Sequence, residues 1–140
     1  MNRVRRPRVL VIDHETRVRE LLCNLLTVLD CEAYGAADGA EGLAVFEPGR
    51  YDLVLADVSM SGVTGWEVAQ AVRRRAPTVG VILLAGSATN LDSARARQWR
   101  LTLLEKPVRL EELAAVLCRE FAPGVAPEQT GTLLPGEPYP

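Results

Sequence analysis

Short apolar runs alternate along the chain with segments in which apolar residues recur every three to four positions. The short runs are typical of buried strands, and the spaced segments have the period of amphipathic helices. The expected strands lie at residues 8–12, 31–36, 51–56, 79–85 and 101–104. The expected helices lie at residues 16–29, 38–46, 66–75, 88–98 and 109–121. This alternation predicts an open, parallel α/β sheet with right-handed crossovers.

Local signals refine this outline. Asp38 and Glu41 have the spacing of a capping box at the start of the second helix. The run 79–85 is the most hydrophobic and predicts a strand that is covered on both faces. Residues 88–98 hold few large apolar side chains, which predicts a loosely packed helix. In the last helix, the residues expected to face inward are Leu110, Leu113, Ala114, Leu117 and Phe121. The arginines at 73–75 are interpreted as a solvated helix end that suits the helix dipole.

Composition narrows the class of protein. The chain has 140 residues, of which 48% are hydrophobic, so a sizeable core is expected without disulfides or metals. Its net charge of −2 argues against a polyanionic partner. Cys23, Cys31 and Cys118 are odd in number and widely spaced, which is typical of reduced thiols in a cytosolic protein. Because no apolar run reaches membrane-span length and no signal peptide is visible, we expect a cytoplasmic protein.

The two ends of the chain differ from its middle. Four of the first eight residues are Arg, and residues 1–7 are interpreted as a solvated basic leader. Contact with nucleic acid or a membrane is the alternative for this leader. Residues 122–140 hold five prolines and three glycines, which predicts a disordered tail, with a docking peptide as the alternative. The expected domain therefore covers residues 8–121, with no segment long enough for an output domain.

The candidate chemistry lies at the strand ends. Asp13 ends the first expected strand and Asp57 the third, while Lys106 follows the fifth in a chain with fifteen arginines and no other lysine. In open parallel sheets, ligands bind outside the carboxyl ends of the strands. Two acids suit Mg²⁺, an aspartate can attack phosphorus, and an ammonium neutralises phosphoryl oxygens. The alternative is that strand-end aspartates are ordinary turn residues.

Three segments resemble one known family. Residues 51–60, followed by Gly65-Trp66-Glu67-Val68, look like the phosphoacceptor segment of two-component response-regulator receiver domains (CheY-like). Residues 9–15 resemble the family's acidic turn, and Glu105-Lys106-Pro107 resembles its Lys-Pro turn. The resemblance covers roughly residues 7–121. It implies the flavodoxin-like, doubly wound fold, in which five parallel strands in the order 2-1-3-4-5 carry helices on both faces.

The resemblance also implies residue roles. Asp57 would accept a phosphoryl group from the phosphohistidine of a sensor histidine kinase or phosphotransfer protein. Asp13, Asp57 and the backbone carbonyl of Ser59 would bind Mg²⁺, and Lys106 would contact the phosphoryl group. Such a receiver is not an enzyme beyond self-catalysed phosphorylation and dephosphorylation. It would signal by binding a downstream protein, without direct nucleic-acid or membrane contact, as a monomer or as a homodimer through the fourth and fifth helices.

Four positions depart from the family pattern, and the smallest change is Ser61 in place of a proline, which loosens the loop. His14 stands where the family has a second acid, and imidazole suits Mg²⁺ poorly, so weaker Mg²⁺ binding through an atypical ligand is expected. Ala85 replaces the family's Ser or Thr, for which Ser87 is a possible substitute or else the cap of the next helix. Leu103 replaces the aromatic switch residue.

These departures leave two further hypotheses beside the phosphorylated receiver. A degenerate receiver would act as a phosphorylation-independent, constitutive interaction module, which His14, Ala85 and Leu103 favour. A Mg²⁺-dependent phosphohydrolase would use Asp57 as its nucleophile. It lacks the second acid expected two residues later, where Ser59 stands.

Overall fold

The computed structural model describes residues 5–86 and 92–121. The chain divides into two compact units, with the boundary between Val108 and Arg109. The sheet and four helices belong to the first unit, and one helix belongs to the second.

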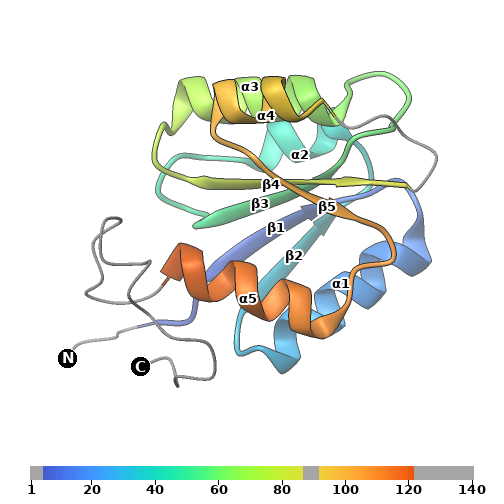
Figure 1. Cartoon of the computed structure of the whole chain (residues 1–140), viewed down its shortest axis with the longest axis vertical. Coiled ribbons are helices and arrows are strands. Elements are labelled where there is room, and N and C mark those ends of the chain that lie inside the picture. Colours follow the sequence, from blue (N-terminus) through green and yellow to red (C-terminus); the bar gives the residue numbers. More distant parts are fainter. Residues whose placement is uncertain (1–4, 87–91, 122–140) are drawn as a thin grey trace. The chain divides into compact units, whose positions relative to one another are not determined.

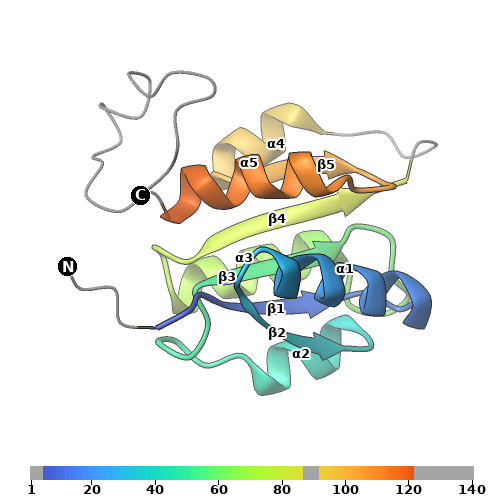
Figure 2. The ribbon, with the colours of Figure 1, turned by 90° about the horizontal axis from the view of Figure 1, so that it is seen from below.

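Five parallel strands form one sheet in the order β2-β1-β3-β4-β5, which confirms the predicted order (Figure 1). The strands are β1 (Arg8–Ile12), β2 (Glu32–Ala36), β3 (Leu53–Asp57), β4 (Gly80–Ala85) and β5 (Thr102–Glu105). Helix α1 (Thr16–Val28) lies on one face of the sheet. The opposite face carries α2 (Gly39–Val45), α3 (Gly65–Arg75) and α4 (Ser93–Trp99) (Figure 2). Helices therefore cover both faces, as a doubly wound fold requires.

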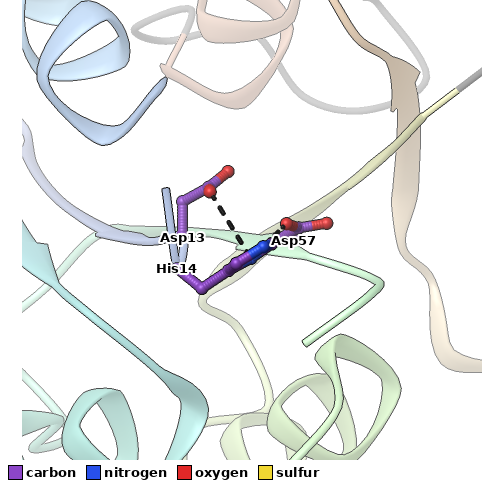
Figure 3. Close-up of side chains that lie close together, drawn as sticks. All are labelled: Asp13, His14 and Asp57. Atoms are coloured by element: carbon purple, nitrogen blue, oxygen red, sulfur yellow. Dashed lines mark ion pairs between the residues drawn. The ribbon is translucent and has the colours of Figure 1, made fainter. Parts of the chain in front are cut away.

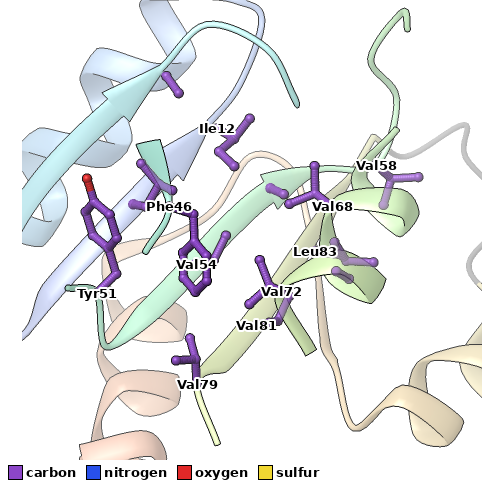
Figure 4. Packing of buried hydrophobic residues seen from close by; sticks show 14 of the residues in the cluster. Ile12, Phe46, Tyr51, Val54, Val58, Val68, Val72, Val79, Val81 and Leu83 are labelled. Atoms are coloured by element: carbon purple, nitrogen blue, oxygen red, sulfur yellow. The ribbon is translucent and has the colours of Figure 1, made fainter. Parts of the chain in front are cut away.

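The central strands are buried on both sides. Every residue of β3 and β4 is buried, which confirms the prediction for the most hydrophobic run. Figure 4 shows the core on the α2/α3 side, where Val54 and Val81 from the sheet meet Val68 and Val72 of α3. With both faces covered, strand positions are fixed and the strand ends become a rigid edge for side chains.

Two helix starts differ from their prediction. The Asp38 carboxylate accepts the backbone N–H of Glu41 at 2.8 Å, as expected of a cap. The Glu41 carboxylate, however, accepts the N–H of Ala37 rather than that of Asp38, so the box is incomplete. A complete capping box occurs instead at Thr64 and Glu67, at the start of α3. It fixes the point where the loop after β3 enters its helix.

The interpretation of residues 73–75 as a solvated helix end is wrong for Arg73. Its guanidinium donates to the carbonyl oxygens of Trp99 at 2.9 Å and of Arg100 at 2.7 Å, and also contacts that of Val79. These carbonyls lie before β4 and at the C-terminal end of α4, so one side chain fastens the end of α3 to both segments. Arg75 likewise donates to a backbone carbonyl, that of Leu43, at 3.1 Å.

Apolar helix positions are only partly buried. Leu21 of α1 is 50% exposed, although its spacing places it among the apolar positions of that helix. Only Ala96 is buried in α4, which fits the predicted loose packing.

Helix α5 (Leu110–Phe121) belongs to the second unit. It buries Leu113 and Leu117 as expected, together with Val116, which the prediction missed. Leu110 is 38% exposed, so its expected inward position is wrong. Within 5–86 and 92–121, no helix has the length and apolar character that a membrane crossing needs.

The described part of the basic leader makes ion pairs within the chain. Arg5 forms two hydrogen bonds to the Asp52 carboxylate, at 2.8 and 3.2 Å, and the N–H of Arg8 donates to the same carboxylate at 2.8 Å. Burial raises the pKa of Asp52, but the hydrogen bonds from Arg5 and Arg8 outweigh it and lower that pKa overall. The predicted tail at 122–140 lies outside the described residues.

Candidate functional site

Three strand ends bring their side chains to one edge of the sheet. Asp13 follows β1, Asp57 is the last residue of β3, and Lys106 follows β5. The ladder holds their backbones in place, since the N–H of Asp13 donates to Ala36 and that of Lys106 donates to Ala85 at 2.8 Å. The predicted meeting of the two acids and the lysine at one edge of the sheet is confirmed.

The Lys106 ammonium bridges the two acids. Its Nζ lies 3.0 Å from Asp13 Oδ2 and 3.1 Å from Asp57 Oδ2. The carboxylates are almost fully buried, at 0% and 3% exposure. Burial lowers the pKa of Lys106, but hydrogen bonds to Asp13 and Asp57 outweigh it, so the pKa lies above its ordinary value. The lysine is therefore fully charged near neutral pH and offsets part of the negative charge.

Backbone contacts orient each carboxylate. Asp13 Oδ1 accepts the N–H of Glu15 at 2.9 Å, and Asp57 Oδ1 accepts the N–H of Ser59 at 3.1 Å. Asp13 Oδ2 is buried, and among the described residues its partner is the Lys106 ammonium at 3.0 Å. A buried carboxylate oxygen in that state is suited to a bound cation. Sequence reasoning missed Arg19, which donates to the backbone carbonyl of Asp13 at 2.7 Å and supports this turn.

His14 lies beside the acid pair. Its Nδ1 is 3.2 Å from Asp57 Oδ2 and 3.9 Å from Asp13 Oδ1, and its side chain is 52% exposed (Figure 3). One ligand atom from each of these three residues lies within 4.8 Å of the others, a spacing that suits a metal ion. The two carboxylates fit a divalent cation. The imidazole does not fit Mg²⁺, which prefers oxygen ligands.

The positions expected to couple the site to the rest of the fold are apolar. Ala85 is fully buried at the end of β4, and Leu103 packs partly buried against the core. Ser87 lies outside the described residues, so its suggested role stays a prediction.

Trp66, at the start of α3, stacks under the Arg95 guanidinium at 4.5 Å from the ring centroid.

Gly65 is a further residue on which the site depends. A Cβ built at this position would collide with the backbone carbonyl oxygen of Asp57 and lie 2.8 Å from Val58 Cα. Only glycine lets α3 approach the end of β3 this closely. The isolated glycine between a loop and a helix was the available sequence signal.

Residues 9–117 match the family described as the response regulator receiver domain, and the chain belongs to this family. It is 32% identical over 116 residues to the transcriptional regulatory protein TcrA of Mycobacterium tuberculosis, covering 82% of this chain and 46% of that protein. It is 28% identical over 111 residues to the autoinducer 1 sensor kinase/phosphatase LuxN of Vibrio harveyi, covering 79% of this chain and 13% of that protein. The chain therefore spans less than half of these curated relatives.

Solved structures show the same fold. The chemotaxis protein CheY4 of Vibrio cholerae superposes with a TM-score of 0.74 at 28% identity, covering 83% of this chain and 99% of that one. The response regulator TrrA of Thermotoga maritima, solved in complex with Mg²⁺-BeF, gives a TM-score of 0.73 at 32% identity, covering 82% and 99%. The protein is thus a CheY-like receiver of two-component signalling, and its relatives include both regulators and sensor kinases.

Proposed function

We propose that Asp57 accepts a phosphoryl group from the phosphohistidine of a sensor histidine kinase or a phosphotransfer protein. A carboxylate oxygen of Asp57 attacks phosphorus while the phosphorus–nitrogen bond of the donor breaks. The electron pair of that bond goes to the departing imidazole nitrogen, which takes up a proton from solvent. The product is an acyl phosphate on Asp57, and the signal then passes by protein–protein contact.

The single observation that carries this proposal is the Lys106 ammonium, 3.1 Å from Asp57 Oδ2 and shared with Asp13. A transferred phosphoryl group spreads negative charge over its oxygens, and a nearby ammonium neutralises that charge. A compact ammonium can follow those oxygens in a way that a planar guanidinium cannot. A divalent cation bound to the same acids would supply further charge neutralisation at the phosphoryl oxygens.

Intact-mass measurement after incubation with acetyl phosphate tests this proposal directly. Wild type with Mg²⁺, and in parallel with Mn²⁺, is expected to gain the mass of one phosphoryl group. Asp57→Asn is expected to gain none, whereas Asp38→Asn, which keeps a helix cap at an exposed position, should behave as wild type. Unmodified wild type under both metal conditions, or modification that persists in Asp57→Asn, would refute the proposal.

A second candidate is a constitutive interaction module that does not use phosphorylation. Ala85 and Leu103 favour it, since neither side chain can form the hydrogen-bonded coupling on which the family's switch depends. Beryllofluoride titration followed by NMR distinguishes the two candidates. Shifts of backbone signals at 57–65 support the phosphorylated receiver, and an unchanged spectrum supports the module.

The oligomeric state belongs to the same proposal. The receiver acts as a monomer or as a homodimer through α4 and α5. Light scattering with and without beryllofluoride separates these states, because a phosphorylation-dependent dimer changes mass only when the phosphoryl analogue is present.

A further inference from the structure

We propose that Asp13, His14 and Asp57 form a binding site for a divalent transition metal of the Co²⁺, Ni²⁺ or Zn²⁺ class, in preference to Mg²⁺. The proposal concerns the same pocket as the proposed phosphotransfer. It does not need phosphorylation to occur, because metal binding is measured on the unmodified chain.

The ligand spacing suits a metal of this size. Bonds of about 2.1 Å place two ligand atoms about 3.0 Å apart at a right angle and about 3.4 Å apart at a tetrahedral angle. His14 Nδ1 and Asp57 Oδ2 are 3.2 Å apart, between these values. Asp13 Oδ1 lies somewhat farther from His14 Nδ1, at 3.9 Å. Because the His14 side chain is 52% exposed, its ring can adjust toward a shared ion without repacking the core.

The carboxylates are already positioned for such an ion. Each has one oxygen held by a backbone N–H two residues later, from Glu15 and from Ser59. The buried Asp13 Oδ2 is held by the Lys106 ammonium at 3.0 Å. Little conformational freedom therefore remains to be lost when the two acids bind a cation, which favours affinity.

The net charge of the site and the type of its ligand atoms together determine which metal ion it prefers. Two carboxylates and the Lys106 ammonium leave a net charge of about −1 in the pocket when the imidazole is neutral. A third acid in place of His14 would make the pocket more negative and would add an oxygen ligand, both of which favour Mg²⁺. Imidazole nitrogen adds no charge, and it strengthens binding mainly for transition metals. His14 thus weakens Mg²⁺ binding while it retains a third ligand for the transition metals.

Calorimetric titration of the full chain with Zn²⁺ and with Mg²⁺ gives the two affinities. Wild type is expected to bind Zn²⁺ more tightly. The variant His14→Asp is expected to lower the ratio of Zn²⁺ to Mg²⁺ affinity at least about tenfold, because it exchanges a direct nitrogen ligand for oxygen. Glu47→Gln, which removes an acid whose side chain is 69% exposed, serves as the control and should leave the ratio unchanged.

The NMR signals of the imidazole nitrogens supply a readout at the residue itself. His14 is the one histidine of the chain, so its two ring nitrogens are assigned without ambiguity. Zn²⁺ is expected to shift Nδ1, and an equal amount of Mg²⁺ is expected to leave it in place. Alkylating the thiols of Cys23 and Cys118 beforehand removes competing soft ligands.

Each outcome decides the proposal. A Zn²⁺-dependent Nδ1 shift together with the altered ratio in His14→Asp supports it. An unmoved imidazole, a Mg²⁺ affinity equal to that for Zn²⁺, or an unchanged ratio in the variant overturns it. Failure of Asp57 phosphorylation would leave these titrations intact, and failure of the metal preference would leave the mass assay intact, so the two proposals fail separately.

Discussion

Replacing Lys106 by Met removes the ammonium that two buried carboxylates share. At an effective dielectric constant of about 20, each of its contacts, at 3.0 and 3.1 Å, corresponds to about 5 kcal/mol of Coulomb attraction. Desolvation of the ammonium offsets part of this energy, and truncating one partner of a buried pair typically costs about 3–5 kcal/mol. Because the Lys106 side chain keeps 18% exposure, we expect the lower value, about 3 kcal/mol of unfolding free energy.

Urea unfolding monitored by circular dichroism measures this loss. Arg97→Met is the matched control, since it removes a cation from an exposed position of α4 and should change stability by less than about 0.5 kcal/mol. In the background Asp57→Asn, Lys106→Met should cost less than in wild type, because one of the charges left unpaired is gone. A Lys106→Met protein as stable as wild type would refute the reasoning that this ammonium stabilises the acid pair.

The alkaline range gives a second readout of the same contact. Burial lowers the pKa of Lys106, but the hydrogen bonds to Asp13 and Asp57 raise it above the ordinary 10.5 overall. A raised lysine pKa contributes stability that is complete below 10.5 and is lost as pH rises through the folded-state value. Wild type should therefore lose more stability than Lys106→Met above this pH, and parallel curves for the two proteins would contradict the assignment.

Three other perturbations test the supporting structure. Gly65→Ala should destabilise the domain by about 1–3 kcal/mol and reduce phosphoryl incorporation, because the new methyl group displaces the end of β3; thermal unfolding and the mass assay measure both. Burial, with a smaller contribution from a neighbouring carboxylate, raises the pKa of Cys31 from 9.0 to about 11. The free energy of unfolding of wild type should therefore fall between these pH values, and that of Cys31→Ala should fall less. Arg73→Met should cost about 2 kcal/mol in urea unfolding through its lost carbonyl contacts. Arg74→Met, which removes a cation–π contact with Trp99, should cost less than about 1 kcal/mol.

The sequence predicts the sheet well because its strands are strongly marked. Uninterrupted apolar runs such as those of β3 and β4 indicate strands that are buried on both faces. The strand order came from the family resemblance, since periodicity alone does not order parallel strands. Several strand boundaries differ from the predicted ones by one or two residues, because backbone hydrogen bonds determine where a strand begins and ends. Cys31 is outside β2 because its N–H donates to Leu26 at the end of α1.

The types of residue in the site and their location in the fold were predictable from the sequence, but the contacts of their side chains were not. Asp13, Asp57 and Lys106 could be placed together because carboxyl ends of parallel strands share one edge. Arg73 could not be assigned its role, since an arginine at a helix end looks the same whether it faces solvent or a carbonyl on a distant loop. The capping box of Thr64 and Glu67 was as predictable as the pair Asp38 and Glu41, because both pairs have the same three-residue spacing of a capping residue and an acid.

The apolar positions around the site limit how phosphorylation of Asp57 could be transmitted. A ligand shifts a conformational equilibrium only through contacts that differ between the two states. The side chains of Ala85 and Leu103 offer no hydrogen bond. Among the described residues, the polar groups in contact with the Asp57 carboxylate are the Lys106 ammonium, the His14 imidazole and the N–H of Ser59. The ammonium stays inside the pocket, whereas Ser59 begins the loop that Gly65 packs tightly against the end of β3. A response that begins at the Ser59 N–H would therefore reach α3 through that loop.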